Sequence, residues 1–166
     1  ALFAPYLRTV NQYKCPADRS KWPIAANGKV ASELRSYALN SYLGTRAAGV
    51  QRPLVQSPYY KVHLKSSSLA ADGPAGRFLF MDVNPANICT PGFGVDMDLN
   101  FIIHYPSVLH HGQGVVAFAD SHIETHKWLD PRTRKTATGA NYIAHTDPVG
   151  GNKDFAWIVS RTTSKK

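Results

Sequence analysis

The sequence predicts an α+β fold in which an antiparallel β-sheet is organised around one hairpin. Residues 115–119 and 123–128 are rich in strand-forming side chains, and Asp120 and Ser121 between them are typical of a tight turn. Residues 77–82 form another short apolar run, which ends before an Asn-Pro strand breaker. Helical spacing of apolar residues near the amino terminus predicts a short helix that packs on this sheet.

The remaining elements follow in chain order. Residues 1–10 carry the predicted amino-terminal helix, and residues 34–43 predict a strand. Residues 59–64 fit either a strand or the lead into a helix, and residues 101–103 predict a brief edge strand. Residues 154–161 fit a helix or a strand docked on the sheet. Proline, glycine and polar residues predict loops at 21–32, 44–57, 87–99 and 130–148.

A two-residue turn fixes the predicted register of the hairpin. Phe118 would then face Ile123, and Val116 would face Thr125. Because side chains alternate across a sheet, these four residues form the predicted core face. The other face carries a row of ligand-capable groups at strand spacing, followed by an aromatic residue: His122, Glu124, His126 and Trp128.

Length and composition are typical of one globular domain over residues 1–166. Hydrophobic residues make up 43% of the chain and charged residues 18%, which excludes wholesale disorder. No apolar run approaches the roughly 20 residues that a membrane span needs, and no signal peptide is recognisable. The net charge of +8 comes from scattered basic residues, so it favours weak contact with anionic polysaccharide over nucleic-acid binding.

The two cysteines, Cys15 and Cys89, do not by themselves make a zinc site, which takes three or four nitrogen or sulfur ligands. In an oxidising compartment they would pair in a disulfide and close a long loop. The alternative is two buried free thiols. The sequence leaves both possibilities open.

The row of His122, Glu124 and His126 is a candidate site for zinc or another transition metal, with two nitrogens and one carboxylate as ligands. Neighbours on one strand face lie about 6.6 Å apart, however, so their side chains converge on one ion only with favourable rotamers. A solvated or partner-facing polar surface is the simpler interpretation.

His110 and Asp120 look like a catalytic pair, but an extended chain would hold them about 25–30 Å apart. In the predicted register, His110 and His111 lie near Asp130, and a hydrogen bond from histidine to Asp130 would close the open end of the hairpin. Asp120 is predicted to order its own turn by accepting from backbone N–H groups. The chain carries no nucleophile, zinc-protease or phosphate-loop motif, so the sequence predicts no catalytic residue and no enzyme.

Three carboxylates, Asp82, Asp96 and Asp98, are candidate calcium ligands, because calcium takes six to eight oxygen atoms. Ordinary solvated carboxylates are the competing interpretation, since the order Asp-x-Asp alone is a weak signal. Calcium is therefore a possible cofactor, and the sequence requires none.

Several short motifs, taken in order, resemble those of one bacterial family. Residues 110–122 and the residues after them, Glu124 and Lys127-Trp128, resemble the H-x9-DG motif of prepilin-type, pseudopilin-like proteins. Residues 13–18 (YKCPAD) are similar to the CPSD stretch of this family, and residues 36–40 (SYALN) to its SYxxN stretch. Asp82 after FLFM and residues 128–133 (WLDPRT) also fit. Ser121 stands where the family has glycine, which puts the turn geometry in doubt.

The resemblance implies a pilin-like fold and a structural function. Full-length members begin with a prepilin cleavage site and a long apolar helix, which this sequence lacks, so the chain is expected to be the globular head. The head would be exported to the periplasm or cell surface and would assemble with other pilin-like subunits in a type II secretion or type IV pilus-like filament. Membrane contact would come only through the missing helix. Some family members carry calcium in a loop beside the sheet.

Two other functions stay open from the sequence. In the first, loops and aromatic residues bind glycan or another extracellular polymer; the aromatic residues are Tyr59, Tyr60, Trp128 and Tyr142. In the second, His122, Glu124 and His126 hold the metal of a hydrolase.

Overall fold

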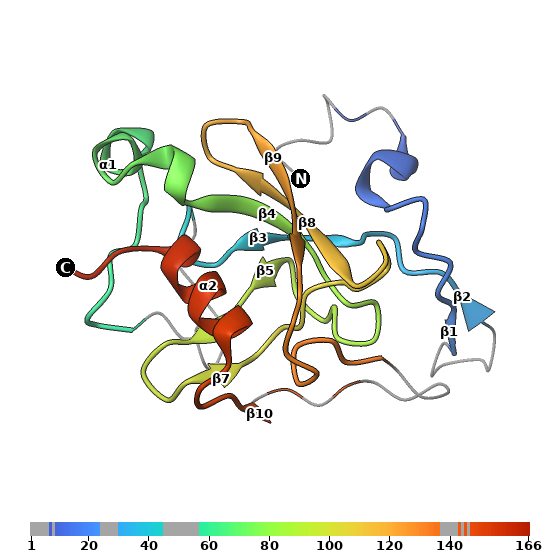
Figure 1. Ribbon diagram of the computed structural model, residues 1–166. Coiled ribbons are helices and arrows are strands. Elements are labelled where there is room, and N and C mark those ends of the chain that lie inside the picture. The colour runs from blue at the N-terminus through green and yellow to red at the C-terminus, as the bar shows by residue number, and fades with distance from the viewer. Residues whose placement is uncertain are drawn as a thin grey trace.

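The computed structural model describes residues 7, 9–23, 30–44, 57–136, 143, 145 and 147–166. Within these residues the fold is α+β, with mixed and antiparallel sheets and few helices (Figure 1). Most of the helix predicted at residues 1–10, and most of the loop predicted at 44–57, lie outside the described residues.

The largest sheet has the strand order β5-β3-β4-β8-β9. Its strands are β3 (Tyr37–Asn40), β4 (Phe78–Asp82), β5 (Gly92–Phe93), β8 (Gln113–Phe118) and β9 (Ile123–Lys127). All neighbours are antiparallel except β5, which runs parallel to β3. The predicted hairpin and the predicted strands at 34–43 and 77–82 are therefore confirmed, with the first of these strands shorter than expected.

Short strands also lie within three predicted loops. β6 (Val95–Asp96), β7 (Phe101–Ile102) and β10 (Asp147–Pro148) form a second sheet in the order β10-β7-β6. β7 is therefore the middle strand of that sheet, whereas the sequence predicts an edge strand there. β1 (Trp22–Pro23) and β2 (Val30–Ala31) pair as an antiparallel ribbon.

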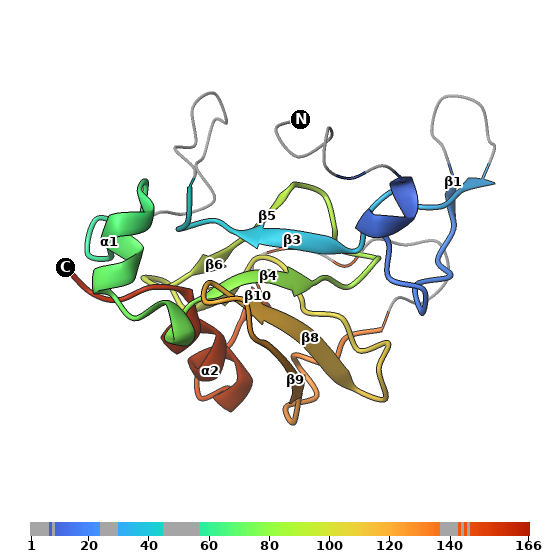
Figure 2. The same cartoon turned by 90° about the horizontal axis from the view of Figure 1, so that it is seen from above.

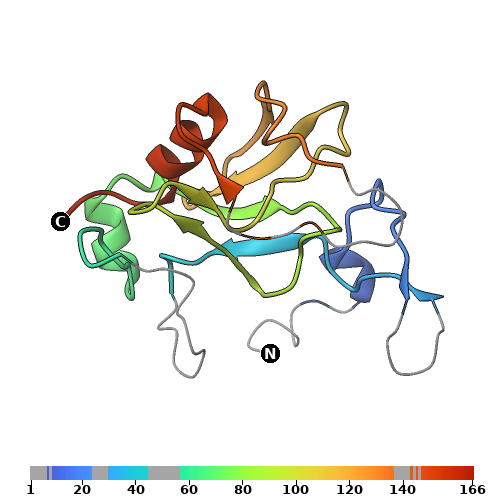
Figure 3. The same ribbon diagram turned by 90° about the horizontal axis from the view of Figure 1, so that it is seen from below.

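The described helices are short. They are the 3-10 helix η1 (Val10–Tyr13), α1 (Ser66–Ala71), the 3-10 helix η2 (Pro74–Gly76) and α2 (Lys153–Thr162). In all three views α1 lies at the same end of the molecule as the carboxyl terminus (Figures 1, 2 and 3). A bond from the Ser164 hydroxyl to Asp72 and a bridge between Tyr60 and Lys165 hold these segments together.

The residues at its amino end determine where α2 begins. The Asn152 side chain accepts a hydrogen bond from the Phe155 backbone N–H (3.0 Å), which satisfies one donor that the first helical turn leaves unpaired. Phe155, Ile158 and Thr162 recur at helical spacing and are buried. The segment for which the sequence allows a helix or a strand is therefore a helix.

The core lies between the largest sheet, the second sheet and α2. Phe155 and Ile158 of α2 share one buried cluster with Phe78, Val116 and Trp128. Trp128 is fully buried, and its indole N–H donates to the Ser107 carbonyl (3.0 Å). A Cβ at Gly114 would lie 2.8 Å from the Trp128 ring, so glycine is what allows the ring to pack against β8.

The hairpin register differs from the predicted one by one residue. Ala117 pairs with Ile123 and Val116 with Glu124. The loop has three residues instead of two, because Phe118 accepts from the Ser121 N–H and donates to the His122 carbonyl. Ser121 has a φ of 79°, the left-handed conformation that three-residue hairpin loops use at this position.

This shift exchanges the two faces of β9. A slip of one residue moves every side chain of a strand to the opposite face. His126 and Trp128 therefore turn toward the core side, and Ile123 and Thr125 point outward, where Ile123 is 68% exposed. The predicted core face is thus correct for β8, where Val116 and Phe118 are buried, and wrong for β9.

Candidate functional site

The side of the largest sheet opposite the core carries an apolar surface that stays accessible. We call it the open face and define it by Tyr37, Phe80, Val115, Ala117 and Ile123, which line a shallow pocket of about 350 Å³. Tyr37, Val115 and Ala117 alternate along β3 and β8 with buried residues, so the pleat of the sheet directs them away from the core. On β4 the register shifts between Phe78 and Phe80, which leaves Phe78 buried and Phe80 on the open face. Phe80 is 37% exposed.

Residues from the amino-terminal segment lie at the open face. Leu7 and Gln12 line the same pocket as the sheet residues. Leu7 is half-buried although it belongs to no described helix or strand. The segment that precedes β1 therefore reaches the open face rather than the core side.

A second feature is a polar cluster formed by residues of four separate segments. Cys15 Sγ lies 3.4 Å from His110 Nε2, which in turn lies 3.5 Å from Asp82 Oδ2. Asp82 Oδ1 accepts from the Val115 N–H (2.8 Å). Ser36 links the cluster to the amino-terminal turn, because its hydroxyl accepts from the Cys15 N–H and donates to Asp18 (2.7 Å). We call the five residues Cys15, Asp18, Ser36, Asp82 and His110 the motif cluster.

The two carboxylates of the motif cluster have pKa values shifted in opposite directions. Burial raises the pKa of Asp82 to about 7. Burial would also raise the pKa of Asp18, but hydrogen bonds from Lys14, Ser20 and Ser36 outweigh it and hold that pKa below its usual value. Cys15 is buried, and both Cys15 and Asp82 approach the same nitrogen of His110. The ring therefore cannot relay a proton from one of its nitrogens to the other, as in a catalytic triad.

The predicted metal row on β9 does not converge. His122 Nδ1 lies 2.6 Å from Asp120 Oδ1, and its Nε2 lies 3.2 Å from Glu124 Oε1. The bond to Asp120 is the main cause that raises the pKa of His122. His126 instead stacks on Trp157, with ring centroids 3.9 Å apart. The three side chains stay on one face of β9, but the His126 ring packs on α2 while His122 is held between Asp120 and Glu124, so they do not meet at a common ion.

Asp120 and Asp130 each order their own part of the chain. Asp120 Oδ1 accepts from the His122 backbone N–H (3.2 Å) across the hairpin loop. Asp130 pairs with the Arg132 guanidinium (2.6 Å), and His110 lies instead at Asp82. The predicted hydrogen bond from histidine to Asp130 is therefore replaced by an ion pair within one turn.

The three candidate calcium ligands lie at separate places. Asp82 belongs to the motif cluster. Asp96 Oδ1 accepts from the backbone N–H groups of Asp98 and Leu99, which closes the turn after β6, and Asp98 accepts from the Ser57 hydroxyl (2.7 Å). Each carboxylate thus has its own local partners, and the structure does not assemble the predicted calcium site.

The two cysteines are free, so the disulfide alternative is wrong; the alternative of two buried free thiols is correct for Cys15 alone, because Cys89 is exposed. Cys15 lies in the motif cluster, whereas Cys89 lies against two other histidines. Cys89 Sγ is 3.4 Å from His104 Nε2 and 3.4 Å from His145 Nε2. Among the described residues, these three form the one group whose ligand atoms could hold a metal ion.

No pattern in the sequence predicts the group formed by Cys89, His104 and His145. His104 and His145 lie 15 and 56 residues from Cys89, so no short spacing links them. His104 is buried and accepts from the Gly94 N–H at Nδ1 (2.9 Å), and burial lowers the pKa of its ring to about 3. His104 is therefore a neutral imidazole, the form in which histidine binds metals.

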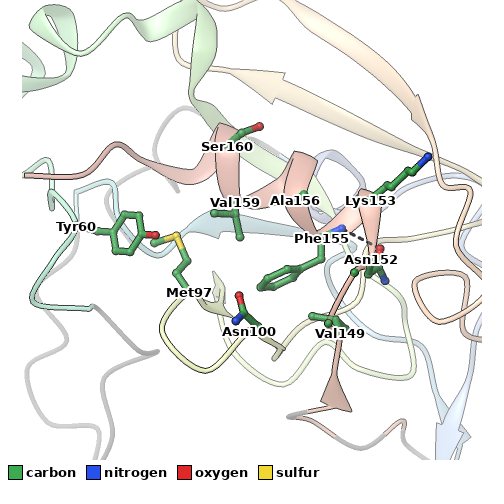
Figure 4. A pocket seen from close by; sticks show the side chains of 12 residues that line it. Tyr60, Met97, Asn100, Val149, Asn152, Lys153, Phe155, Ala156, Val159 and Ser160 are labelled. Atoms are coloured by element: carbon green, nitrogen blue, oxygen red, sulfur yellow. Dashed lines mark hydrogen bonds between the residues drawn. The ribbon is translucent and has the colours of Figure 1, made fainter.

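A larger pocket lies between α2 and the turn after β6 (Figure 4). Its volume is about 510 Å³, and Tyr60, Met97, Phe155 and Val159 form much of its wall. Lys153 supplies the charged side chain among the lining residues that the structure describes. No cluster of titratable groups converges on this pocket within the described part of the chain, so its geometry indicates no chemistry.

Comparison of the chain with protein-family models, with curated proteins and with solved structures finds no match. Among the described helices, none combines the length and the apolar character that a membrane span requires. The class that fold and site define is thus an α+β domain with an open apolar sheet face.

Proposed function

We propose that this chain is the globular head of a pseudopilin-like subunit with a structural role in a surface filament. The open face carries this proposal. A sheet whose second face is apolar and accessible needs a partner, because exposed contiguous apolar surface favours association. Leu7 lines the same pocket, so the amino-terminal segment reaches this face, and in our proposal the partner is an apolar helix on that side of the head.

The motif cluster supports the same function. The residues that carry the family resemblance come from four segments, and Cys15, Ser36, Asp82 and His110 meet in one network. This network joins the amino-terminal segment to β3, β4 and the start of β8. Such residues would keep the head rigidly attached to a helix that transmits assembly forces.

The rival functions receive less support. Trp128, the largest aromatic residue expected to grip a glycan, is fully buried, and Tyr142 lies outside the described residues. Tyr59 is exposed and Tyr60 is half-buried, which leaves few accessible rings for stacking on sugars. The hydrolase alternative needs His126 beside His122, but His126 stacks on Trp157 instead.

The proposal implies export to the periplasm or cell surface and assembly with other pilin-like subunits. It is tested in cells that make the native precursor, by shearing surface filaments, pelleting them and labelling them with gold-conjugated antibody against the head. We expect label along the filaments. Filaments that assemble without label, while the chain remains in the supernatant, would contradict the proposal.

A further inference from the structure

We propose that Cys89, His104 and His145 bind a divalent transition-metal ion of the zinc class, with a fourth coordination position open to solvent. The sulfur lies 3.4 Å from each of the two nitrogens, and all three atoms lie within 4.8 Å of one another. Tetrahedral zinc with a thiolate at about 2.3 Å and an imidazole at about 2.1 Å separates sulfur and nitrogen by about 3.6 Å. The side chains are therefore already near ligand positions.

The ligand types determine which metals fit. Thiolate and imidazole together favour zinc and related transition metals, whereas calcium and magnesium take oxygen ligands. Three protein ligands leave one position of a tetrahedral ion for water or another small ligand. Cys89 and His145 are exposed while His104 is buried, so this position faces the solvent.

His145 is oriented as metal-binding histidines usually are. Its Nδ1 lies 2.6 Å from the Ile103 carbonyl oxygen and 3.2 Å from Asn87 Nδ2; because the carbonyl only accepts and lies closer, Nδ1–H donates there and Nε2 is directed toward Cys89. A backbone carbonyl in this role fixes the ring tautomer and raises the basicity of the ligating nitrogen.

His104 must change one hydrogen bond when the ion binds. Its Nδ1 now accepts from the Gly94 N–H, which places the ring proton on Nε2, facing Cys89. Coordination through Nε2 moves that proton to Nδ1 and breaks the bond to Gly94. One backbone hydrogen bond contributes little compared with a metal–imidazole bond, so the exchange favours the bound ion. The Gly94 amide thus becomes a reporter of metal binding.

The ion would join three segments that are distant in the sequence. Cys89 follows β4, His104 follows β7 and His145 precedes β10. An ion held by all three would fasten the chain around β10 to the rest of the second sheet. Metal binding should therefore raise the thermal stability of the domain as well as give a spectroscopic signal.

The test is a titration of the reduced, metal-free chain with cobalt(II), followed by displacement with zinc. We expect one equivalent to give a thiolate-to-cobalt charge-transfer band, the intense visible bands of tetrahedral cobalt, and a shift of the Gly94 amide resonance. Cys89→Ser should abolish the charge-transfer band. Cys89→Ser and His145→Ala should each weaken binding by more than the roughly 10- to 100-fold typical of an outer-shell change. Both residues are exposed, and circular dichroism checks that the variants fold.

His122→Ala is the matched control, because it removes a half-buried histidine from the other candidate row. It should bind cobalt like the wild type. The proposal is overturned if the wild type gives no charge-transfer band, if the band persists in Cys89→Ser, or if His122→Ala removes it. Absence of the band in the wild type would mean that Cys89 is a thiol hydrogen-bonded between two imidazoles. Loss of the band in His122→Ala would mean that the metal binds at the row of residues on β9.

Discussion

Asp82 is a buried carboxylate that joins two strands at the motif cluster. It accepts from the Val115 N–H through one oxygen, while the other oxygen lies 3.5 Å from His110. Burial in this place raises its pKa to about 7, so the folded protein holds a proton on Asp82 under conditions in which the unfolded chain has lost it. Asp82 therefore contributes to the pH dependence of the stability of the domain.

Asp82→Asn should remove that dependence. The pKa of Asp82 is raised in the folded state, so its favourable contribution is complete below pH 4 and is lost as pH rises through about 7. Between pH 5 and pH 8, the unfolding free energy of the wild type should fall by roughly 2–3 kcal/mol relative to that of Asp82→Asn. Urea unfolding of both proteins at the two pH values measures this. If the unfolding free energies of the two proteins differed by the same amount at pH 5 and at pH 8, the prediction would be refuted.

Gly114 is required by the packing of Trp128. A Cβ at this position would lie 2.8 Å from the Trp128 ring and 3.1 Å from Asp82 Oδ1. Gly114→Ala should therefore lower the unfolding free energy by about 1–3 kcal/mol, because neither neighbour can withdraw from the core. Gly150→Ala, where no atom lies within 4 Å, is the control and should stay within about 0.5 kcal/mol of the wild type. An equal change in unfolding free energy in Gly114→Ala and Gly150→Ala would contradict the claim that Gly114 is required by the packing of Trp128.

Among the elements, the β8–β9 hairpin decides which residues reach the surface. Its loop is closed by Ser121 in the left-handed conformation, at the position where glycine stands in the family that the sequence resembles. The strain of Ser121 is local, since the rest of the hairpin has regular pairing from Gln113 to Lys127.

Ser121→Gly should stabilise the hairpin, because glycine adopts a φ of 79° without steric cost. We expect the unfolding free energy to rise by about 1 kcal/mol. Asp120→Gly is the comparison in the same loop, and it should be destabilising because it removes the acceptor for the His122 N–H. Thermal melts of both variants measure the two effects. A loss of stability in Ser121→Gly would show that Ser121 carries no strain.

Local patterns predicted the elements, while long-range packing determined the register and the sites. The hairpin, β4 and the helical spacing in α2 are each encoded within about fifteen residues. The register could not be predicted, because a two-residue type I′ turn and a three-residue loop both place Ser121 at positive φ, and they differ at Asp120, which does not take a positive φ here. His104 and His145 could not be linked to Cys89, because only the pairing of β6, β7 and β10 brings them together.

At the scale of the whole molecule, the largest sheet has two different faces. One packs on α2 and the second sheet in a continuous buried cluster. The other exposes Phe80 and Ile123 beside Leu7. The proposed function depends on this asymmetry, because a helix that docks on the open face would join the head to a filament.

The central claim is tested most directly by filament incorporation of the precursor carrying Ile123→Lys, compared with Leu99→Lys. Both side chains are exposed to a similar extent, 68% and 64%, but Leu99 lies in the turn after β6, away from the open face. A lysine charge at the docking surface would be buried against an apolar helix, so Ile123→Lys should lower the head content of pelleted filaments by about ten-fold or more. Leu99→Lys should incorporate like the wild type. Equal incorporation of all three proteins would contradict the claim that the open face is where the head is held.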